Sequence, residues 1–286
     1  MAFLPLRTVD LPDASSKLYE RWLGELGERL DDPATDRARL TREVLTELWF
    51  PGLRDYDAMA EDPAVPLATR AALLGLDPRN VTLEPEYYGE VDAEKFARAK
   101  PLLWLWYGFD RSPLGGQNVH LGVRLRRLLA GHLFARVGRN FKAFQHVEFT
   151  YGYNLEVGDD VVVHRHVLLD DRGGITLGDR VSISDYANIY SHTHSIVEQK
   201  DVTNARTVLE DDVRITYHAT VLAGVRVGRN GMVGASAVAT KDVRPYHVNV
   251  GIPAKSVRVK PNAPPEVYVT ERVANRPAGA APEEGR

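Results

Sequence analysis

The 286-residue chain contains no cysteine and no long hydrophobic run. The absence of cysteine excludes a disulfide framework, a thiolate zinc site and a cysteine nucleophile, and it is compatible with a reducing compartment. The most conspicuous apolar run, residues 101–109 (PLLWLWYGF), is far shorter than the roughly 20 residues that a membrane helix needs. We therefore expect a soluble, cytoplasmic protein without a membrane partner.

The chain also lacks a large excess of charge of either sign. Its 36 Lys and Arg residues nearly balance 39 Asp and Glu residues, which gives a formal net charge of -3. A small net charge gives no global attraction to nucleic acid or to anionic lipid. The first residues have no basic flank followed by an apolar stretch and so do not resemble a secretory signal. We expect no nucleic-acid partner, and any anionic ligand must be held by local groups.

The first part of the chain has the apolar spacing of helices. Leu18, Trp22, Leu26 and Leu30 recur every four residues, which is typical of one buried helix face. Similar spacing predicts further helices near residues 40–48, 67–74, 91–105 and 123–134. We predict an N-terminal α-helical domain over residues 1–136.

The spacing changes to six residues at Val137. The aliphatic or aromatic residues at this spacing are Val137, Ala143, Phe149; Val157, Val163, Leu169; Leu177, Ile183, Ile189; Leu209, Ile215, Val221; and Val227, Val233, Ala239. Neither an α-helix nor a two-sided strand repeats every six residues, whereas a coil with one short strand on each side does. The protein is therefore predicted to be mainly β, with a parallel β-helix of hexapeptide repeats over residues 137–260. Residues 261–286, rich in Pro, Ala, Gly and Glu, are predicted to be a partly disordered C-terminal tail.

The breaks in the repeat fall at regular positions. Each of the three breaks comes after a third hexad, so with three hexads per turn all of them leave the coil at one corner. The first two add two residues each, and the third is the long segment Ser195–Val208. Long loops in compact domains are commonly functional. We expect this segment to project into solvent or over a neighbouring subunit.

Two His-x-His pairs are candidate site residues: His164 with His166, and His192 with His194. Residues two apart on an extended segment share a face, so each pair could chelate a metal or could be split by a corner. Such a pair alone is more often structural than catalytic, but His192 and His194 lie immediately before the long break. Neutral imidazole suits the removal of a proton from a hydroxyl. No cysteine or Gly-x-Ser-x-Gly elbow is present, which favours direct attack on an activated acyl donor.

Several ordered motifs carry a family resemblance. They are Tyr151–Asp159, Leu169-Asp170, Ile189–His194, Leu222–Val225, Thr240–Val243 and Gly251–Ala254. Together they resemble the maltose and galactoside O-acetyltransferases of the hexapeptide-repeat acyltransferases, over roughly residues 130 to 260. The resemblance implies a left-handed β-helix, a homotrimer with active sites between subunits, and acetyl-CoA as co-substrate with no metal.

The resemblance also implies roles for individual residues. It places the catalytic histidine, the general base that deprotonates a small-molecule hydroxyl acceptor, at His194. Acceptor contacts fall at Thr150, His164, Asp170 and Asp171. His192 is the runner-up for the catalytic histidine and a further candidate for an acceptor contact. Coenzyme contacts fall at Tyr217, Ala235, Thr240, Lys241 and Arg258. The protein is thus expected to be an acetyl-CoA-dependent O-acetyltransferase acting on a sugar or another small molecule.

The sequence departs from the family pattern in three respects, which involve four positions. His164 stands where the family has asparagine, Arg214 and Thr216 replace a Trp-x-Gly, and Ser195 follows the histidine where the family has Pro or Asp. These departures favour acyl transfer as the chemistry more than sugar as the acceptor. Two alternatives remain open: a metal-dependent hydratase that uses the His-x-His pairs, and a binding scaffold that has lost turnover.

Overall fold

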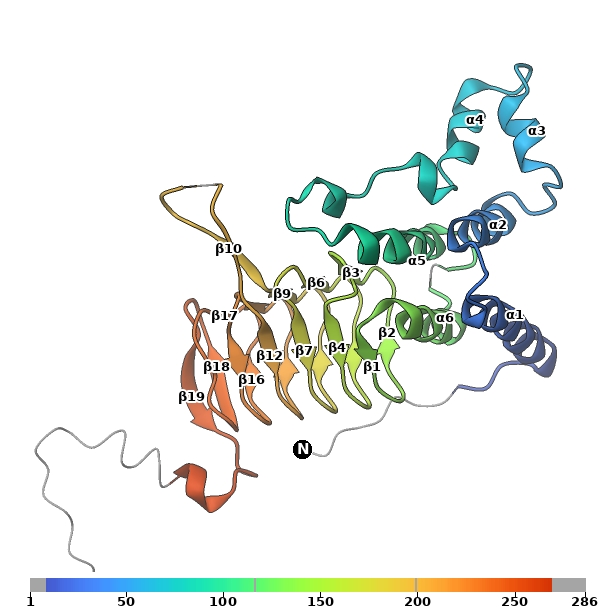
Figure 1. Ribbon diagram of the computed structural model, residues 1–286. Coiled ribbons are helices and arrows are strands. Elements are labelled where there is room, and N and C mark those ends of the chain that lie inside the picture. The colour runs from blue at the N-terminus through green and yellow to red at the C-terminus, as the bar shows by residue number, and fades with distance from the viewer. Residues whose placement is uncertain (1–8, 116, 199, 269–286) are drawn as a thin grey trace, which may run out of the picture.

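A computed structural model describes residues 9–115, 117–198 and 200–268. It shows a row of short strands wound into a coil, with helices at one end of the row (Figure 1). The helices are α1 (Asp13–Asp31), α2 (Arg37–Trp49), α3 (Tyr56–Glu61), α4 (Leu67–Leu74), α5 (Ala93–Arg111) and α6 (Val119–Leu133), with 3-10 turns η1 (Pro78–Asn80) and η2 (Glu84–Tyr87). Helices therefore form at each of the five predicted segments, with shifted ends. The helical prediction is wrong in one detail, because Leu18 is exposed while Leu26 and Leu30 are buried.

The coil consists of three parallel sheets, one on each side. The first contains β1 (Arg136–Val137), β4 (Leu155–Val157), β7 (Ile175–Leu177), β12 (Thr207–Leu209) and β15 (Arg226–Val227). The second contains β2 (Lys142–Ala143), β5 (Val162–Val163), β8 (Ser182–Ile183), β13 (Arg214–Ile215), β16 (Met232–Val233) and β18 (His247–Val250), followed by the antiparallel strand β19 (Lys255–Val259). The third contains β3 (Glu148–Phe149), β6 (Leu168–Asp170), β9 (Asn188–Tyr190), β14 (Thr220–Val221) and β17 (Val238–Ala239).

The strand register confirms that the six-residue repeat forms a parallel β-helix. Val157 pairs with Val137 below it and with Leu177 above it, and Ile183 pairs with Val163 and Ile215 in the same way. The hexad positions therefore lie above one another and point inward. From Ala143 to Ala239 every one of them is buried. The fold predicted from the spacing is confirmed, with the helical region at its N-terminal end.

The first corner of each turn explains why glycine and aspartate follow the first hexad position. The carboxylates of Asp159, Asp179 and Asp211 each accept the backbone N–H of the residue one turn below, at 2.7, 2.8 and 3.0 Å. A Cβ placed on Gly158 would come within 2.7 Å of the backbone of the next turn. Glycine thus permits the close approach of turns, and aspartate satisfies a donor at each corner.

The corner between the second and third sheets carries a column of aromatic and imidazole side chains. His146, His166, Tyr186 and His218 occupy left-handed backbone conformations, with φ of 57–60°. Successive rings stack at 4.8, 4.8 and 4.9 Å between centroids. A non-glycine residue with positive φ is strained, and contacts within the column offset part of that cost.

Side chains from the helices bind the backbone groups at the N-terminal edge of the first turn. Arg126 is buried against Asp110 and donates to the Ala143 carbonyl at 3.1 Å, while Asp110 accepts the His146 N–H at 2.7 Å. Trp106 donates in the same way to the Val147 carbonyl at 3.0 Å. An uncovered edge would offer unpaired backbone groups to other chains. The helical region therefore covers one end of the coil.

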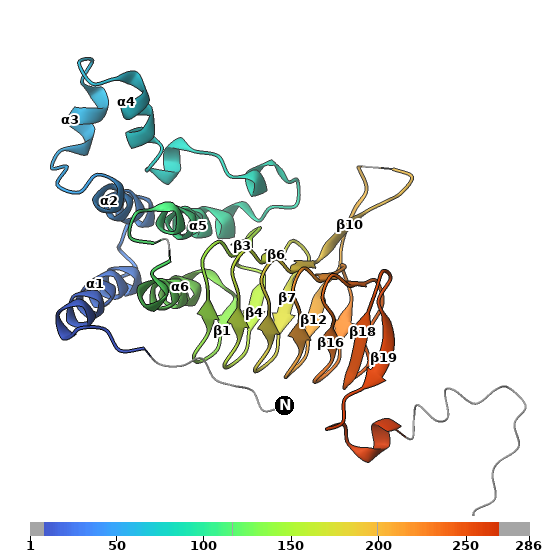
Figure 2. The same ribbon diagram turned by 180° about the vertical axis from the view of Figure 1, so that it is seen from behind.

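The long break leaves the coil as a two-stranded hairpin of β10 (His192–His194) and β11 (Val202–Asn204). Both views show it projecting away from the row of strands, on the side occupied by α5 (Figure 2). The predicted projection is thus confirmed, and the His192–His194 pair lies on the projecting strand itself.

The predicted division at residues 136/137 and 260/261 remains a prediction, although α6 ends at Leu133 and β19 ends at Val259. Most of the predicted tail, residues 269–286, lies outside the described residues. None of the helices in the described ranges combines the length and apolar character that a membrane span requires.

Candidate active site

The strand β10 places two imidazoles side by side. His192 and His194 are two residues apart on an extended strand and therefore share a face. Their ring centroids are 5.3 Å apart and their planes nearly perpendicular. His194 is exposed, whereas the side chain of His192 is only 18% exposed because it turns back toward the coil. The pair combines one accessible imidazole with one that is held in place.

Asp170 holds His192. This carboxylate ends β6 and is almost fully buried, with one oxygen bonded to Nδ1 of His192. Its other oxygen accepts the hydroxyl of Thr150 at 2.9 Å. Both oxygens of Asp170 are therefore engaged within the chain. A carboxylate at Nδ1 favours the proton on that nitrogen and leaves Nε2 as the acceptor.

The next residue, Asp171, has a structural role in the same corner. Its carboxylate accepts backbone N–H groups of Tyr151 at 2.7 Å and Asn154 at 3.2 Å. Burial raises the pKa of Asp171 to about 7, although these two donors favour the charged form. Since Asp171 has no exposed surface, the structure does not offer it to an acceptor in this arrangement.

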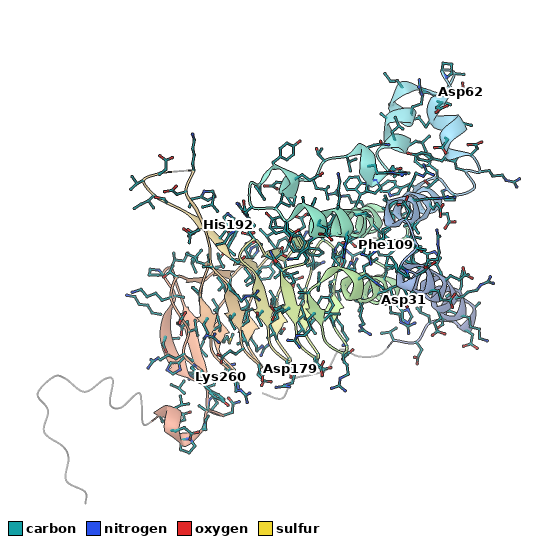
Figure 3. All side chains as sticks on the ribbon, in the orientation of Figure 1. Asp31, Asp62, Phe109, Asp179, His192 and Lys260 are labelled. Atoms are coloured by element: carbon teal, nitrogen blue, oxygen red, sulfur yellow. The ribbon has the colours of Figure 1, made fainter. Side chains whose placement is uncertain are left out.

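A hollow of about 910 Å³ lies beside the two histidines. One wall is the hairpin, and the opposite wall is the segment Glu84–Glu90, which we call the η2 segment, from the helical region before α5. Figure 3 shows His192 at the base of the hairpin, and this residue lines the same hollow as the η2 segment. The site therefore joins two parts of the chain that are about a hundred residues apart in sequence.

Arg172 ties the η2 segment to the coil. Its guanidinium donates to Glu90 at 2.6 Å and lies 4.0 Å from the centroid of the Tyr88 ring. Burial alone would raise the pKa of Glu90, but hydrogen bonds, including that from Arg172, lower it. Only 5% of the Arg172 side chain is exposed. Sequence reasoning missed both Arg172 and the η2 segment, because neither carries a repeat or a recognisable motif.

The predicted acceptor residues do not all come together. Thr150, Asp170 and His192 form one hydrogen-bonded group at the corner where the hairpin leaves. His164 lies at a different corner, stacked on Phe144 with ring centroids 5.1 Å apart. Desolvation lowers the pKa of His164, which favours its neutral form. Within one chain, His164 is therefore separated from the other acceptor candidates.

The five coenzyme candidates are all exposed on the last turns of the coil. Tyr217 and Ala235 lie at the corner between the second and third sheets. Thr240 and Lys241 follow β17 at another corner, and Arg258 lies on β19. A single chain thus places these residues on several faces and does not gather them around His194.

The structure also bears on the metal alternative. Across the described parts of the chain, no three His, Cys, Asp or Glu side chains are grouped so that they could hold a metal ion. The pair His164 and His166 is split by the corner, since His166 adopts a left-handed conformation and stacks on its own column. No observation therefore favours the hydratase alternative.

Sequence comparison finds acetyltransferases among the known proteins that resemble this chain. The chain is 28% identical over 140 residues to the galactoside O-acetyltransferase of Escherichia coli (strain K12), a match that spans 48% of this chain and 69% of that protein. It is 31% identical over 137 residues to a protein named "putative acetyltransferase" from Staphylococcus aureus (strain COL), spanning 46% of this chain and 69% of the relative. No protein-family model matches the sequence.

Solved structures show the same fold. A maltose O-acetyltransferase from Clostridium difficile 630 superposes with a TM-score of 0.53 at 24% identity, covering 61% of this chain and 91% of that one. A hexapeptide-repeat acetyltransferase from Vibrio cholerae O1 biovar eltor, solved with acetyl coenzyme A, gives a TM-score of 0.52 at 24% identity, with coverage of 64% and 97%.

The coil and the sequence likeness define one class, the acetyltransferases built on a left-handed β-helix. This chain belongs to the hexapeptide-repeat acetyltransferases. The predicted family and the prediction of an acyltransferase enzyme are confirmed. The roles of the individual site residues remain predictions.

Proposed function

We propose that this protein transfers an acetyl group from acetyl-CoA to a hydroxyl of a small molecule, a sugar or another hydroxylated compound. The observation that carries the proposal is the pair His192 and His194 on one face of β10, beside a hollow. The names of the sequence relatives and the acetyl coenzyme A in a structural neighbour support the donor. We propose the cytoplasm as its location, with which a chain that has no cysteine is compatible.

His194 is the proposed general base. Its imidazole takes the proton of the acceptor hydroxyl while the hydroxyl oxygen attacks the thioester carbonyl carbon. The tetrahedral intermediate then collapses, the carbon–sulfur bond breaks, and the imidazolium returns the proton to the coenzyme A thiolate. A backbone N–H at or near Tyr217 is the proposed donor to the oxyanion, an interaction worth several kcal/mol in general.

His192 is proposed as an acceptor contact that supports this reaction. Its Nδ1 is held by Asp170, which in turn is held by Thr150, so its Nε2 edge has a fixed direction. Asp170 and Thr150 then act on the acceptor through His192. We retain His164 and Asp171 as acceptor candidates only from the family resemblance.

The distribution of the coenzyme candidates supports a homotrimer with active sites between subunits. Tyr217, Ala235, Thr240, Lys241 and Arg258 lie on outer faces of the coil and not around His194 of the same chain. A neighbouring copy related by rotation can bring its own set to the hairpin of the first. The hollow beside His194 is then completed by the partner subunit.

The proposal is tested by release of free thiol from acetyl-CoA across a panel of sugars, amino sugars and hydroxylated natural products. Wild-type protein should release thiol only when an acceptor is present. His194→Ala should lower kcat by about 10²- to 10⁴-fold, while His166→Ala, which removes an exposed histidine of the corner column, should retain activity. Unchanged turnover in His194→Ala would overturn the assignment of the base. If none of the acceptors in the panel stimulated thiol release, the proposed transferase activity would be overturned.

A further inference from the structure

The η2 segment forms the wall of the hollow that faces the histidines. Glu84, Tyr87, Tyr88 and Glu90 all line the same hollow as His192 and His194. Both ribbon views show the chain before α5 reaching along the coil toward the projecting hairpin (Figures 1 and 2). Any acceptor that reaches the histidines from this side therefore passes the η2 segment.

Contacts at both ends hold this wall in place. Arg172 pairs with Glu90, as described above, and Lys100 of α5 donates to Glu86 at 2.8 Å. The backbone N–H of Asp92, just after the wall, donates to the Tyr153 hydroxyl at 3.2 Å. The wall is thus fixed both to the coil and to α5, as expected of a surface that positions a ligand.

Most polar groups of the wall are already engaged. Glu90 is paired with Arg172, Glu84 accepts the Tyr88 hydroxyl, and the Tyr88 ring is covered by the Arg172 guanidinium. The Tyr87 hydroxyl is engaged as well, 3.1 Å from Thr82 Oγ1. Its ring, unlike that of Tyr88, is not covered, and the residue is 75% exposed. The wall therefore presents one anchored aromatic ring toward the hollow.

We infer that the η2 segment sets acceptor specificity, and that Tyr87 packs against a flat ring of the acceptor while the acceptor's hydroxyl reaches the histidines. An exposed aromatic ring offers a large contact area at low entropic cost, and ring pairs gain further from offset or edge-to-face geometry. The ligand class is a hydroxylated compound that carries an aromatic ring beside its reacting part. This inference rests on the proposed function only in treating the ligand as the acetyl acceptor.

Binding measured by calorimetry tests the inference without relying on turnover. The probes are methyl β-D-glucoside and phenyl β-D-glucoside, which share their hydroxyls and differ in the aromatic ring. Wild-type protein should bind the phenyl compound about three- to tenfold more tightly. Tyr87→Ala should abolish that difference, and Tyr87→Phe should retain it because the ring stays. Leu18→Ala, which removes an exposed apolar side chain of α1, serves as the control.

A second variant tests whether the anchoring of the wall matters. Glu90→Gln keeps the shape of the side chain but removes the charge that pairs with Arg172. It should reduce the preference for the phenyl glucoside about threefold, with unchanged affinity for acetyl-CoA, while the melting temperature falls because Arg172 loses its partner charge in a buried setting. A merely structural role would lower the melting temperature and weaken the binding of both glucosides and of acetyl-CoA alike.

The outcomes separate this inference from the proposed function. Equal binding of the two glucosides by wild-type protein, or retention of the difference in Tyr87→Ala, would overturn the role of Tyr87 even if acetyl transfer is intact. Conversely, if wild-type protein prefers the phenyl glucoside and Tyr87→Ala does not, the role of the η2 segment in specificity is supported even if thiol release fails. Absence of binding by both probes would overturn the ligand class.

Discussion

The regular turns of the coil and the long break after β9 differ in what determines the position of a side chain. In the turns, every sixth residue points inward, and its burial follows from its position in the count alone. In the break, the chain leaves the coil, and His192 and His194 come to a partly open hollow whose far wall belongs to the helical region. Side chains in the turns are thus replaceable by others of similar shape, whereas those at the break are defined by their chemistry. Stability and activity should therefore respond to different substitutions.

The largest expected effect is on a regular turn. Ile183→Ala removes a fully buried side chain that stacks between Val163 and Ile215. Its cavity should lower the free energy of unfolding by about 2–5 kcal/mol, measured by urea denaturation. Ser182→Ala on the same strand points outward and should change stability by less than about 0.5 kcal/mol. Equal effects of the two variants would contradict the distinction between inward and outward positions.

The contribution of Asp171 to the stability of the fold should depend on pH. Its folded pKa, raised by burial to about 7, lies above the ordinary value near 3.9 of an unfolded chain. The folded state therefore binds the proton more tightly, and its stabilisation is complete below about pH 4 and lost as the pH rises through 7. Asp171→Asn should remove this loss, which amounts to at most about 4 kcal/mol. Thermal unfolding of both proteins between pH 4 and 8 measures it, and parallel curves would count against a buried proton.

At the break, Asp170→Asn should separate activity from stability. An amide cannot accept hydrogen bonds from both Thr150 and Nδ1 of His192, so the ring loses its fixed tautomer. We expect kcat/KM for the acceptor to fall about tenfold, with the KM for acetyl-CoA unchanged. Steady-state kinetics with each substrate varied in turn checks this. A fall confined to the acetyl-CoA side would mean that Asp170 does not act through His192.

The smallest expected effect comes from Thr150→Val. This substitution keeps the side-chain shape and removes the hydroxyl that donates to Asp170 at 2.9 Å. The lost hydrogen bond is worth about 1 kcal/mol, so activity toward the acceptor should fall severalfold, less than in Asp170→Asn. The double variant should be no worse than Asp170→Asn alone if the two residues act in one chain of contacts. Additive losses would show that Thr150 has a separate role.

The regular part of the molecule could be predicted because its signal is local and repeated. Each hexad position reports the same environment, so Val157, Leu177 and Leu209 reinforce one another and fix the sheet register. The break in the count also predicts where the chain leaves the coil, next to His192 and His194, but not that it does so as a hairpin. This part of the prediction rested on residues that are close in sequence.

The rest of the site could not be predicted because it depends on contacts between distant residues. Glu90 and Arg172 meet across 82 positions, and no periodic pattern marks either of them. His164 and Asp170 show the reverse case: they are six residues apart but lie at different corners of the coil. Leu18 follows the spacing of a buried helix face and is nevertheless exposed, because burial also depends on which element packs against that face.

The stacking of turns has a consequence for how such a protein can change in length. Neighbouring strands lie about 4.8 Å apart, so adding or deleting one whole turn moves everything beyond it by a single fixed step along the axis. Tyr217 and Arg258 lie beyond the hairpin along this axis, so an inserted turn between them would alter their spacing from one another while leaving the helical end and the hairpin as they are. The coil thereby allows the reach between its functional parts to be adjusted in discrete increments.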